Sequence, residues 1–370
     1  MRVARTVPVG FLKVNSGLGG QCRVRRVTST GFSLVELLIA IVLSLIIMTG
    51  LVALYASVSR TNSEMAKTNQ LIENGRFAIQ LLQSDLAHAG FWGAIDPLEA
   101  TAVPDPCLSY ANSGSRPKWP TDAALLAAYK TNLLAIPVHG YADGSALTNC
   151  GVANVAAKSN VLIVRHANTC VAGSSGCDGG SDIVGPHIQQ SGCRTGVPLE
   201  ASYVLDGTVA NFTLKAKDCA TVAPRRKMIV NIYYVATSNG QPTLMRVSMD
   251  NGVYSSPEPL VDGIEAFQVE YGIDTLGSNG LAISATNPGD GNADSYVSCA
   301  PDCNLATLAN VVAVKLHVLA RNLDPTAGYI ANKVYQLGPL SVPAANDNYK
   351  RHVFSTTVRL VNTSSRRELP

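Results

Sequence analysis

Hydrophobic residues form one long run near the start of the chain, from Leu37 to Leu54. These eighteen residues include no charged side chain, and residues 32–35 extend the apolar run backwards. A helix needs about twenty mainly apolar residues to cross the hydrocarbon core of a bilayer. The pattern therefore predicts a membrane-spanning helix over residues 32–54.

The next segment, residues 55–93, has the pattern of an amphipathic helix. Apolar or small residues recur every three or four positions, which places them on one helix face: Leu71, Gly75, Ala78, Leu82, Leu86 and Ala89. The sequence Gly-Phe-Trp-Gly at residues 90–93 predicts the end of the helix. Glycine weakens a helix interior, so we expect bending or local melting at Gly50 and Gly75.

From residue 227 onward the hydrophobic period changes from that of a helix to two, the period of a strand. Five stretches alternate in this way and predict half-buried antiparallel strands: Met228–Tyr234, Met245–Met249, Phe267–Tyr271, Val312–Val318 and Phe354–Leu360. Residues 227–370 are therefore expected to form an antiparallel β region.

The intervening residues 94–226 have no sustained period and are rich in Pro, Gly, Ser and Asn. We predict a short helix at about 121–135, a strand at Val161–Arg165, and otherwise loops. The expected fold is therefore α+β, with a long N-terminal helix, transmembrane and then amphipathic, that carries a β-rich head, residues 94–370, with a loop-rich insertion at 94–226.

Charge is distributed unevenly along the 370 residues. Residues 1–31 contain six basic side chains and no acid, and the rest of the chain has 23 basic and 26 acidic residues. Basic residues before an apolar span set the N-terminus in the cytoplasm and the following domain on the other side of the membrane. The remainder lacks the clustered positive charge that nucleic acid binding requires, so we expect no nucleic acid partner.

The cysteines indicate an oxidising compartment. One of the nine, Cys22, lies in the basic N-terminal stretch, which leaves an even number of eight in the rest of the chain. We expect Cys299 to pair with Cys303, because Pro301 between them favours a turn, and Cys170 to pair with Cys177. The pairing of the remaining four stays open: Cys107, Cys150, Cys193 and Cys219.

A single acid, Glu36, stands at the beginning of the apolar run. Inside a membrane helix a carboxylate costs roughly 2.5 to 3.5 kcal/mol on insertion scales, so it is expected to have a functional partner. The alternative is a carboxyl group that stays protonated or reaches the membrane interface.

The ten residues from 31 to 40, Gly-Phe-Ser-Leu-Val-Glu-Leu-Leu-Ile-Ala, resemble the type IV prepilin cleavage and methylation motif. The resemblance implies that a prepilin peptidase cuts between Gly31 and Phe32 and methylates the new amino group of Phe32. It also implies that Glu36 pairs with the N-terminal amine of a neighbouring subunit when the helices pack into a pilus. Residues 1–31 would be a leader that is long for this family, and a translation start near Val24 or Val27 is an open alternative.

Further stretches are similar to the PilW family of minor pilins: residues 74–86 with 89–93, residues 260–272 and residues 353–360. This resemblance implies a pilin-like head and a non-enzymatic protein without cofactors, which primes pilus assembly near the tip and supports twitching motility or cell adhesion. The implied partners are the prepilin peptidase, other minor pilins, the major pilin and the inner-membrane assembly platform. The implied location is the inner membrane, with a periplasmic head, and then the extracellular pilus.

Three other functions stay open from the sequence. A type II secretion pseudopilin would share the leader, helix and β-rich head. A tip adhesin would use residues 94–226, because exposed loops on a scaffold commonly carry binding functions. A membrane-anchored enzyme has little support, since the chain has no nucleophile elbow, phosphate-binding glycine loop or zinc-protease motif.

Two metal sites are weaker possibilities. Asp290, Asn292 and Asp294 offer oxygen ligands at alternate positions, as the start of a calcium loop does. The twelfth position of such a loop would be a proline instead of glutamate, so a solvated acidic turn is the favoured interpretation. His166 and His187, near Cys170 and Cys193, lack the repeated spacing of a zinc site, and we expect no metal.

Overall fold

The computed structural model describes residues 33–93, 98–110, 117–177, 185–195, 201–299 and 303–368. The chain divides into two compact units, Met1–Arg60 and Thr61–Pro370. The cleavage site predicted at residues 31 and 32 lies outside the described residues.

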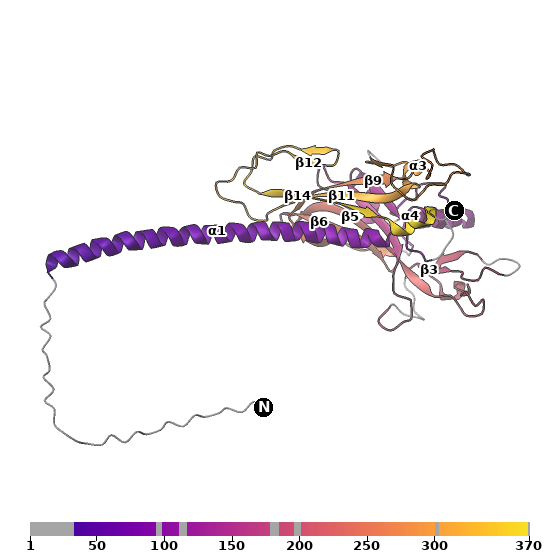
Figure 1. The fold of residues 1–370 in the computed structure, drawn as a ribbon. Coiled ribbons are helices and arrows are strands. Elements are labelled where there is room, and N and C mark those ends of the chain that lie inside the picture. Colours follow the sequence, from indigo (N-terminus) through magenta and orange to yellow (C-terminus); the bar gives the residue numbers. More distant parts are fainter. Residues whose placement is uncertain are drawn as a thin grey trace, which may run out of the picture. The chain divides into compact units, whose positions relative to one another are not determined.

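Helix α1, Leu34–His88, is one continuous helix of 55 residues (Figure 1). In the first unit its apolar side chains are exposed, for example Leu38 at 54% and Ile46 at 62%. An 18-residue window of this helix has a mean hydropathy of 2.9, which makes it a candidate membrane span. The helix continues through Gly50 and Gly75, so the expectation of local melting there is wrong.

In the second unit, α1 buries one stripe of small and aliphatic residues. The buried positions are those that the sequence period indicates, which confirms the amphipathic pattern: Leu71, Gly75, Ala78, Leu82 and Leu86. The helix ends where residues 90–93 predict, since Gly90 and Gly93 both have positive φ angles of 71° and 89°, a conformation that glycine adopts without steric cost.

The first sheet has eight strands and is built around a long hairpin of β5 and β6. Its order is β1-β2-β5-β3-β4, while β6 pairs with β5, and β7 and β8 pair with β6. All pairings in this sheet are antiparallel. The strands are β1 Val138–Tyr141, β2 Val161–Ala167, β3 His187–Gln190, β4 Tyr203–Asp206, β5 Arg225–Ser238, β6 Gln241–Asp250, β7 Val253–Tyr254 and β8 Glu258–Asp262.

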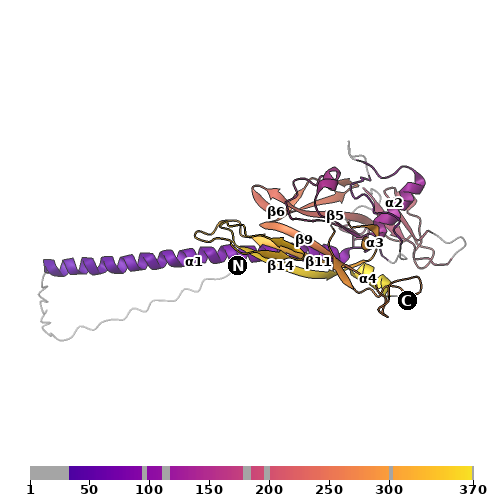
Figure 2. The same cartoon turned by 90° about the horizontal axis from the view of Figure 1, so that it is seen from above.

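The second sheet has four antiparallel strands in the order β10-β9-β11-β14. Their bounds are β9 Ile264–Ile273, β10 Ser295–Val297, β11 Val311–Arg321 and β14 Arg351–Arg359. Figure 2 shows this sheet and the β5–β6 hairpin as two layers. The prediction of half-buried strands is wrong for β9 and β11, which are buried along both faces.

The double burial has an identifiable cause. One set of residues from β9 and β11, including Phe267 and Leu316, shares a core with α1 and the first sheet. The alternate set, Ala266 and Leu319, packs under a two-stranded hairpin of β12 Tyr335–Leu337 and β13 Leu340–Val342. The central strands are therefore covered from both sides.

Residues 94–226 contribute more regular structure than the sequence indicates. Helix α2, Ala123–Ala135, begins where the Asp122 side chain caps the backbone N–H groups of residues 124 and 125, and β2 contains the predicted strand. Three additional strands, β1, β3 and β4, have only four residues each, too few for a period to be distinctive. Short helical elements complete the chain: η1 Ser145–Cys150, η2 Val209–Asn211, α3 Leu305–Leu308 and α4 Val361–Arg367.

Candidate functional site

The best-defined predicted site residue among those described is Glu36, on the first turn of α1. Its Oε2 atom accepts a hydrogen bond from the backbone N–H of Ser33 at 2.9 Å. Ser33 immediately precedes the helix and Glu36 is its third residue, the arrangement in which a glutamate satisfies one of the free N–H groups of a helix start. The carboxylate therefore caps its own helix in the isolated chain.

Gly75 lies in close contact with the second sheet. A Cβ atom at this position would overlap the ring of Phe354, on β14. Glycine is required here because the ring lies directly against the helix backbone, which is a packing role and not the flexible one that the sequence suggests.

Asp85 is the centre of a polar network between α1 and the first sheet. Its Oδ1 atom lies 2.9 Å from His166 Nε2 on β2, and the side-chain amide of Asn231 on β5 donates to both carboxylate oxygens at 3.1 Å. The Asp85 and His166 side chains are 13% and 9% exposed. Although burial lowers the pKa of His166, its hydrogen bond and charge interaction with Asp85 raise it above the ordinary value of 6.5.

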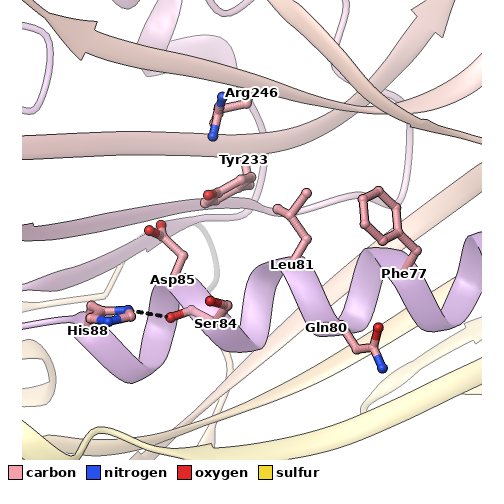
Figure 3. A pocket seen from close by; sticks show the side chains of 8 residues that line it. All are labelled: Phe77, Gln80, Leu81, Ser84, Asp85, His88, Tyr233 and Arg246. Atoms are coloured by element: carbon pink, nitrogen blue, oxygen red, sulfur yellow. Dashed lines mark hydrogen bonds between the residues drawn. The ribbon is translucent and has the colours of Figure 1, made fainter. Parts of the chain in front are cut away.

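Two open grooves flank this network. One, of about 380 Å³, lies between α1 and the β5–β6 hairpin, and Figure 3 shows Phe77, Leu81 and Asp85 pointing from the helix toward Tyr233 and Arg246. The other, of about 320 Å³, shares Asp85 and Arg246 and is also lined by His166 and Asn231. Burial, followed by the charge of Asp85, raises the pKa of Tyr233.

A second polar contact joins α1 to the loop between β11 and β14. Glu64 accepts hydrogen bonds from Lys350 Nζ at 2.9 Å, Thr326 Oγ1 at 2.7 Å and Lys67 Nζ at 3.0 Å. These bonds, that from Lys350 first, lower the pKa of the Glu64 carboxyl to about 2. The contact is an electrostatic tie between the helix and the head.

The C-terminal helix α4 caps the end of α1. The side-chain amide of Asn362 lies 3.3, 3.4 and 3.1 Å from the carbonyl oxygens of residues 87, 88 and 89, and Arg366 donates to Gly90 O at 2.9 Å. The last carbonyl groups of a helix have no partner within the helix. Here the partners come from more than 270 residues later in the chain.

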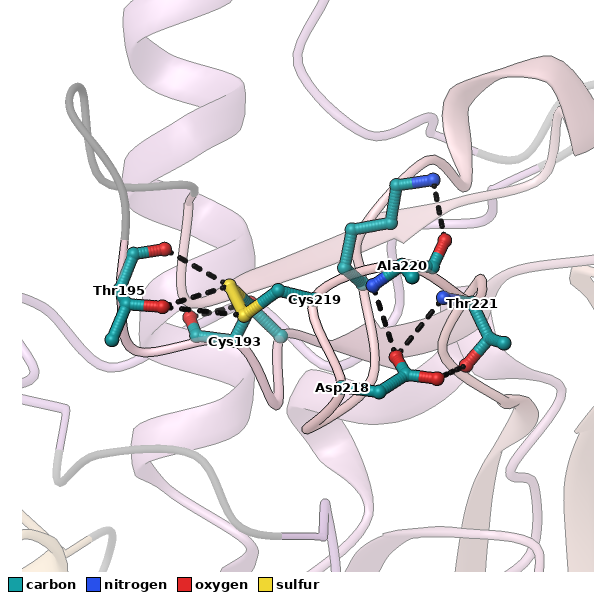
Figure 4. Close-up of a disulfide and its surroundings, with 8 residues drawn as sticks. Cys193, Thr195, Asp218, Cys219, Ala220 and Thr221 are labelled. Carbon is teal, nitrogen blue, oxygen red and sulfur yellow. Dashed lines mark hydrogen bonds between the residues drawn. A yellow bond between two sulfur atoms is a disulfide. The ribbon is translucent and has the colours of Figure 1, made fainter.

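Four disulfides connect the eight cysteines of the described chain. Cys299 is joined to Cys303 and Cys170 to Cys177, the two pairs named from the sequence. The pairs that the sequence left open are Cys107–Cys150 and Cys193–Cys219. Figure 4 shows Cys193–Cys219 beside Thr195, in the loops that follow β3 and precede β5.

Two of the candidate calcium ligands accept backbone hydrogen bonds, Asp290 within its own turn and Asp294 from the segment that follows β9. Asp290 Oδ1 accepts from Asn292 N at 2.9 Å, and Asp294 Oδ2 accepts from the backbone N–H groups of residues 275 and 276 at 2.7 and 2.8 Å. The zinc candidates have other partners. His166 pairs with Asp85 and His187 contacts Gly185 O, while Cys170 and Cys193 are in disulfides. Over the residues that the structure describes, no three His, Cys, Asp or Glu side chains gather as metal ligands would.

Sequence reasoning missed the Asp85 network and the cap from α4. Asp85 and His166 are 81 positions apart, and no spacing rule connects them. One sequence feature could have indicated the network: Asp85 immediately precedes Leu86, so a carboxylate lies beside the apolar stripe of the helix and needs a polar partner.

Comparison with known proteins relates the head to type IV pilus proteins. A family model described as PilW, type IV pilus-assembly protein W, matches residues 232–362. This range begins within β5 and ends in α4, about a third of the chain. No curated protein sequence matches the chain.

Among solved structures, a type IV-like pilin, TTHA1219 from Thermus thermophilus, aligns with 57% of this chain and 81% of its own. The two are 15% identical with a TM-score of 0.28, a similarity too low to bear on fold or function.

Proposed function

We propose, from the match of residues 232–362 to the type IV pilus-assembly protein W family, that this protein is a minor pilin of a type IV pilus. Helix α1 carries the proposal. One continuous helix bears the prepilin-like sequence at its start and places its C-terminal stripe in the core of the head. A signal sequence that is discarded would not be built into that core.

In this proposal, a prepilin peptidase removes residues 1–31 and methylates the amino group of Phe32. The apolar part of α1 holds the protein in the inner membrane, with its head in the periplasm, until assembly. The helix then exchanges lipid for neighbouring helices of the major pilin and other minor pilins at the assembly platform. Head-to-tail contacts of this kind propagate as a filament instead of closing into a ring.

Glu36 would change partner during this exchange. Its carboxylate caps its own helix through Ser33 N–H, and this hydrogen bond can be replaced by one from the Phe32 amine of a neighbouring subunit. A charged donor gives a stronger hydrogen bond than a neutral backbone N–H, especially in a low-dielectric helix bundle. The protein's role is structural, and we propose no catalytic activity.

Mass spectrometry of the N-terminal peptide tests the proposal. The peptide should begin at an N-methylated Phe32, both in membranes and in pili sheared from cells. An uncleaved leader in both fractions would contradict it. Deletion of the gene should abolish surface pili and twitching, whereas loss of protein secretion with normal pili would indicate a type II secretion pseudopilin.

A tip adhesin is a compatible second function. The strands β1–β4 and helix α2 precede the family match, and three of the four disulfides lie in this part of the chain. Binding of the intact protein to host surfaces or glycans, lost when the loop between Cys193 and Cys219 is replaced, would support this function. Equal binding by the replaced protein would assign adhesion elsewhere.

A further inference from the structure

The buried residues of α1 are apolar or small, so the contact between Asp85 and His166 is, like that of Glu64, a polar exception in the interface between the helix and the head. It joins the last turn of α1 to β2, and Asn231 extends it to β5. The aspartate is an acceptor when ionised. It therefore attracts the protonated form of His166 most strongly.

The position of the pair allows its protonation to change without unfolding. Both side chains are mostly buried but line grooves that open to solvent, Asp85 on both sides and His166 on one. Low exposure strengthens the charge interaction, while the grooves give protons access.

The other charged and titratable groups around the pair come from each neighbouring element. His88 on α1 has its ring centre 5.7 Å from that of His166, and β5 contributes Tyr233 and Lys227 to the groove walls. Arg246 on β6 is paired with Glu258 at 2.8 Å. Among the described residues, Asp85 is the carboxylate that His166 contacts directly.

We propose that the Asp85–His166 pair is a pH-sensitive tie that fastens the C-terminal end of α1 to the first sheet in mildly acidic surroundings and loosens it as the surroundings become alkaline. The inference concerns the folded head and does not depend on the pilus role. A histidine whose pKa is raised on folding adds stability that is complete below its unfolded pKa. That stability is lost as the pH rises through the folded pKa.

The direct test is amide hydrogen exchange of the full-length protein in detergent micelles between pH 6 and pH 9, corrected for intrinsic exchange rates. We expect protection of residues 82–91 to fall by about three- to tenfold, the usual difference between a charged and a neutral hydrogen bond. Protection in β11 should change much less. The variant His166→Gln keeps a hydrogen-bond donor but cannot titrate, and its protection at residues 82–91 should be independent of pH.

His88→Gln is the matched control, because His88 lies on the same helix turn and bonds to Ser84 O. It should keep the pH dependence of the unaltered protein. Equal pH dependence in His166→Gln and the unaltered protein would overturn the proposal. If His166→Gln does not fold, the titration of His166 can be followed by NMR in the unaltered protein after histidine-selective ¹⁵N labelling. Loss of the His166 proton below pH 6.5 would overturn the proposal.

Discussion

At the scale of single residues, Glu36 is a carboxylate for which we propose two successive partners. It caps the first turn of α1 in the structure, and its length and position also suit an amine from outside the helix. Neither role needs the helix to change its backbone conformation.

Replacing this carboxylate by an amide separates the two roles. Glu36→Gln retains an oxygen that can accept from Ser33 N–H but loses the charge that would attract a neighbouring amine. We expect membrane insertion to be unchanged and incorporation into sheared pili to fall about tenfold, as removal of one charge-assisted hydrogen bond implies. Quantitative immunoblots of membrane and pilus fractions measure both.

Ser44→Ala is the control, since Ser44 only bonds to the Ile41 carbonyl of its own helix. It should enter pili normally. Normal incorporation of Glu36→Gln would show that the charge is dispensable.

Gly75 is a second residue of interest at this scale, because the sequence suggests flexibility there and the structure shows close packing against Phe354. Replacing glycine by alanine in a helix usually adds about 1 kcal/mol of stability. Here the added methyl group would overlap the Phe354 ring, and overpacking typically costs 1–3 kcal/mol. We therefore expect Gly75→Ala to destabilise the head by about 1–2 kcal/mol, measured by urea unfolding in micelles.

Gly50 is the matched control. A Cβ atom added there would have no other atom within 4 Å apart from the backbone of its own helix turns and its chain neighbours. Gly50→Ala should leave head stability unchanged. A combined Gly75→Ala, Phe354→Leu variant should regain part of the loss. Stabilisation by Gly75→Ala alone would mean that the helix can move away from β14.

At the scale of elements, α1 is held to the head by apolar packing of its C-terminal part, from Leu71 to Leu86, and by polar contacts at Glu64 and Asp85. The Glu64 tie predicts an acid response. The pKa of its carboxyl is about 2 in the folded protein against an ordinary value of 4.5. Its contribution to stability is therefore complete above about pH 4.5 and is lost as the pH falls toward 2.

Urea unfolding at pH values from 6 to 2.5 tests this response. The midpoint should fall with the pH, and Lys350→Gln should flatten the fall, because Lys350 is the largest cause of the lowered pKa. Lys333→Gln is a suitable control, since Lys333 is exposed and lies over Tyr335. An identical acid response in Lys350→Gln would remove Glu64 as its source.

The disulfides should stabilise the head more when the loop that they close is longer, with a logarithmic dependence on loop length. Chain-entropy arguments give about 4 kcal/mol for a loop as long as Cys107–Cys150 and about 2.4 kcal/mol for one as short as Cys170–Cys177, whose separations are 43 and 7 residues. Double alanine variants of each pair, compared by thermal unfolding, should show the larger loss for the first pair. The first pair is also buried in the core, which can only add to its loss, so an equal loss for the two pairs would contradict loop closure as the main source of stabilisation.

At the scale of the whole molecule, the sequence predicts those helices and strands that are long enough to show a hydrophobic period. The stripe of α1 and the long strands β5, β6, β9, β11 and β14 each repeat a pattern over enough residues to be recognised. The four-residue strands β1, β3 and β4 do not, because they gain their structure by pairing with neighbours.

The contacts that the sequence could not predict are those between residues that lie far apart along the chain. Nothing near Asp85 identifies His166 as its partner, and cysteine spacing cannot choose between the possible pairings of four residues. The burial of both faces of β9 and β11 likewise depends on the β12–β13 hairpin, which follows them in the chain.

The cap that α4 places on α1 also constrains the order in which the protein can fold. The carbonyl groups at residues 87–90 are synthesised more than 270 residues before their partners, Asn362 and Arg366. Contacts this far apart in sequence form slowly, because a long loop must close first. The end of α1 therefore stays uncapped until the strands between it and α4 have been synthesised. A chain truncated shortly before α4 would leave the last carbonyl groups of α1 without these partners, so its helix end should exchange amide hydrogens faster than in the intact protein.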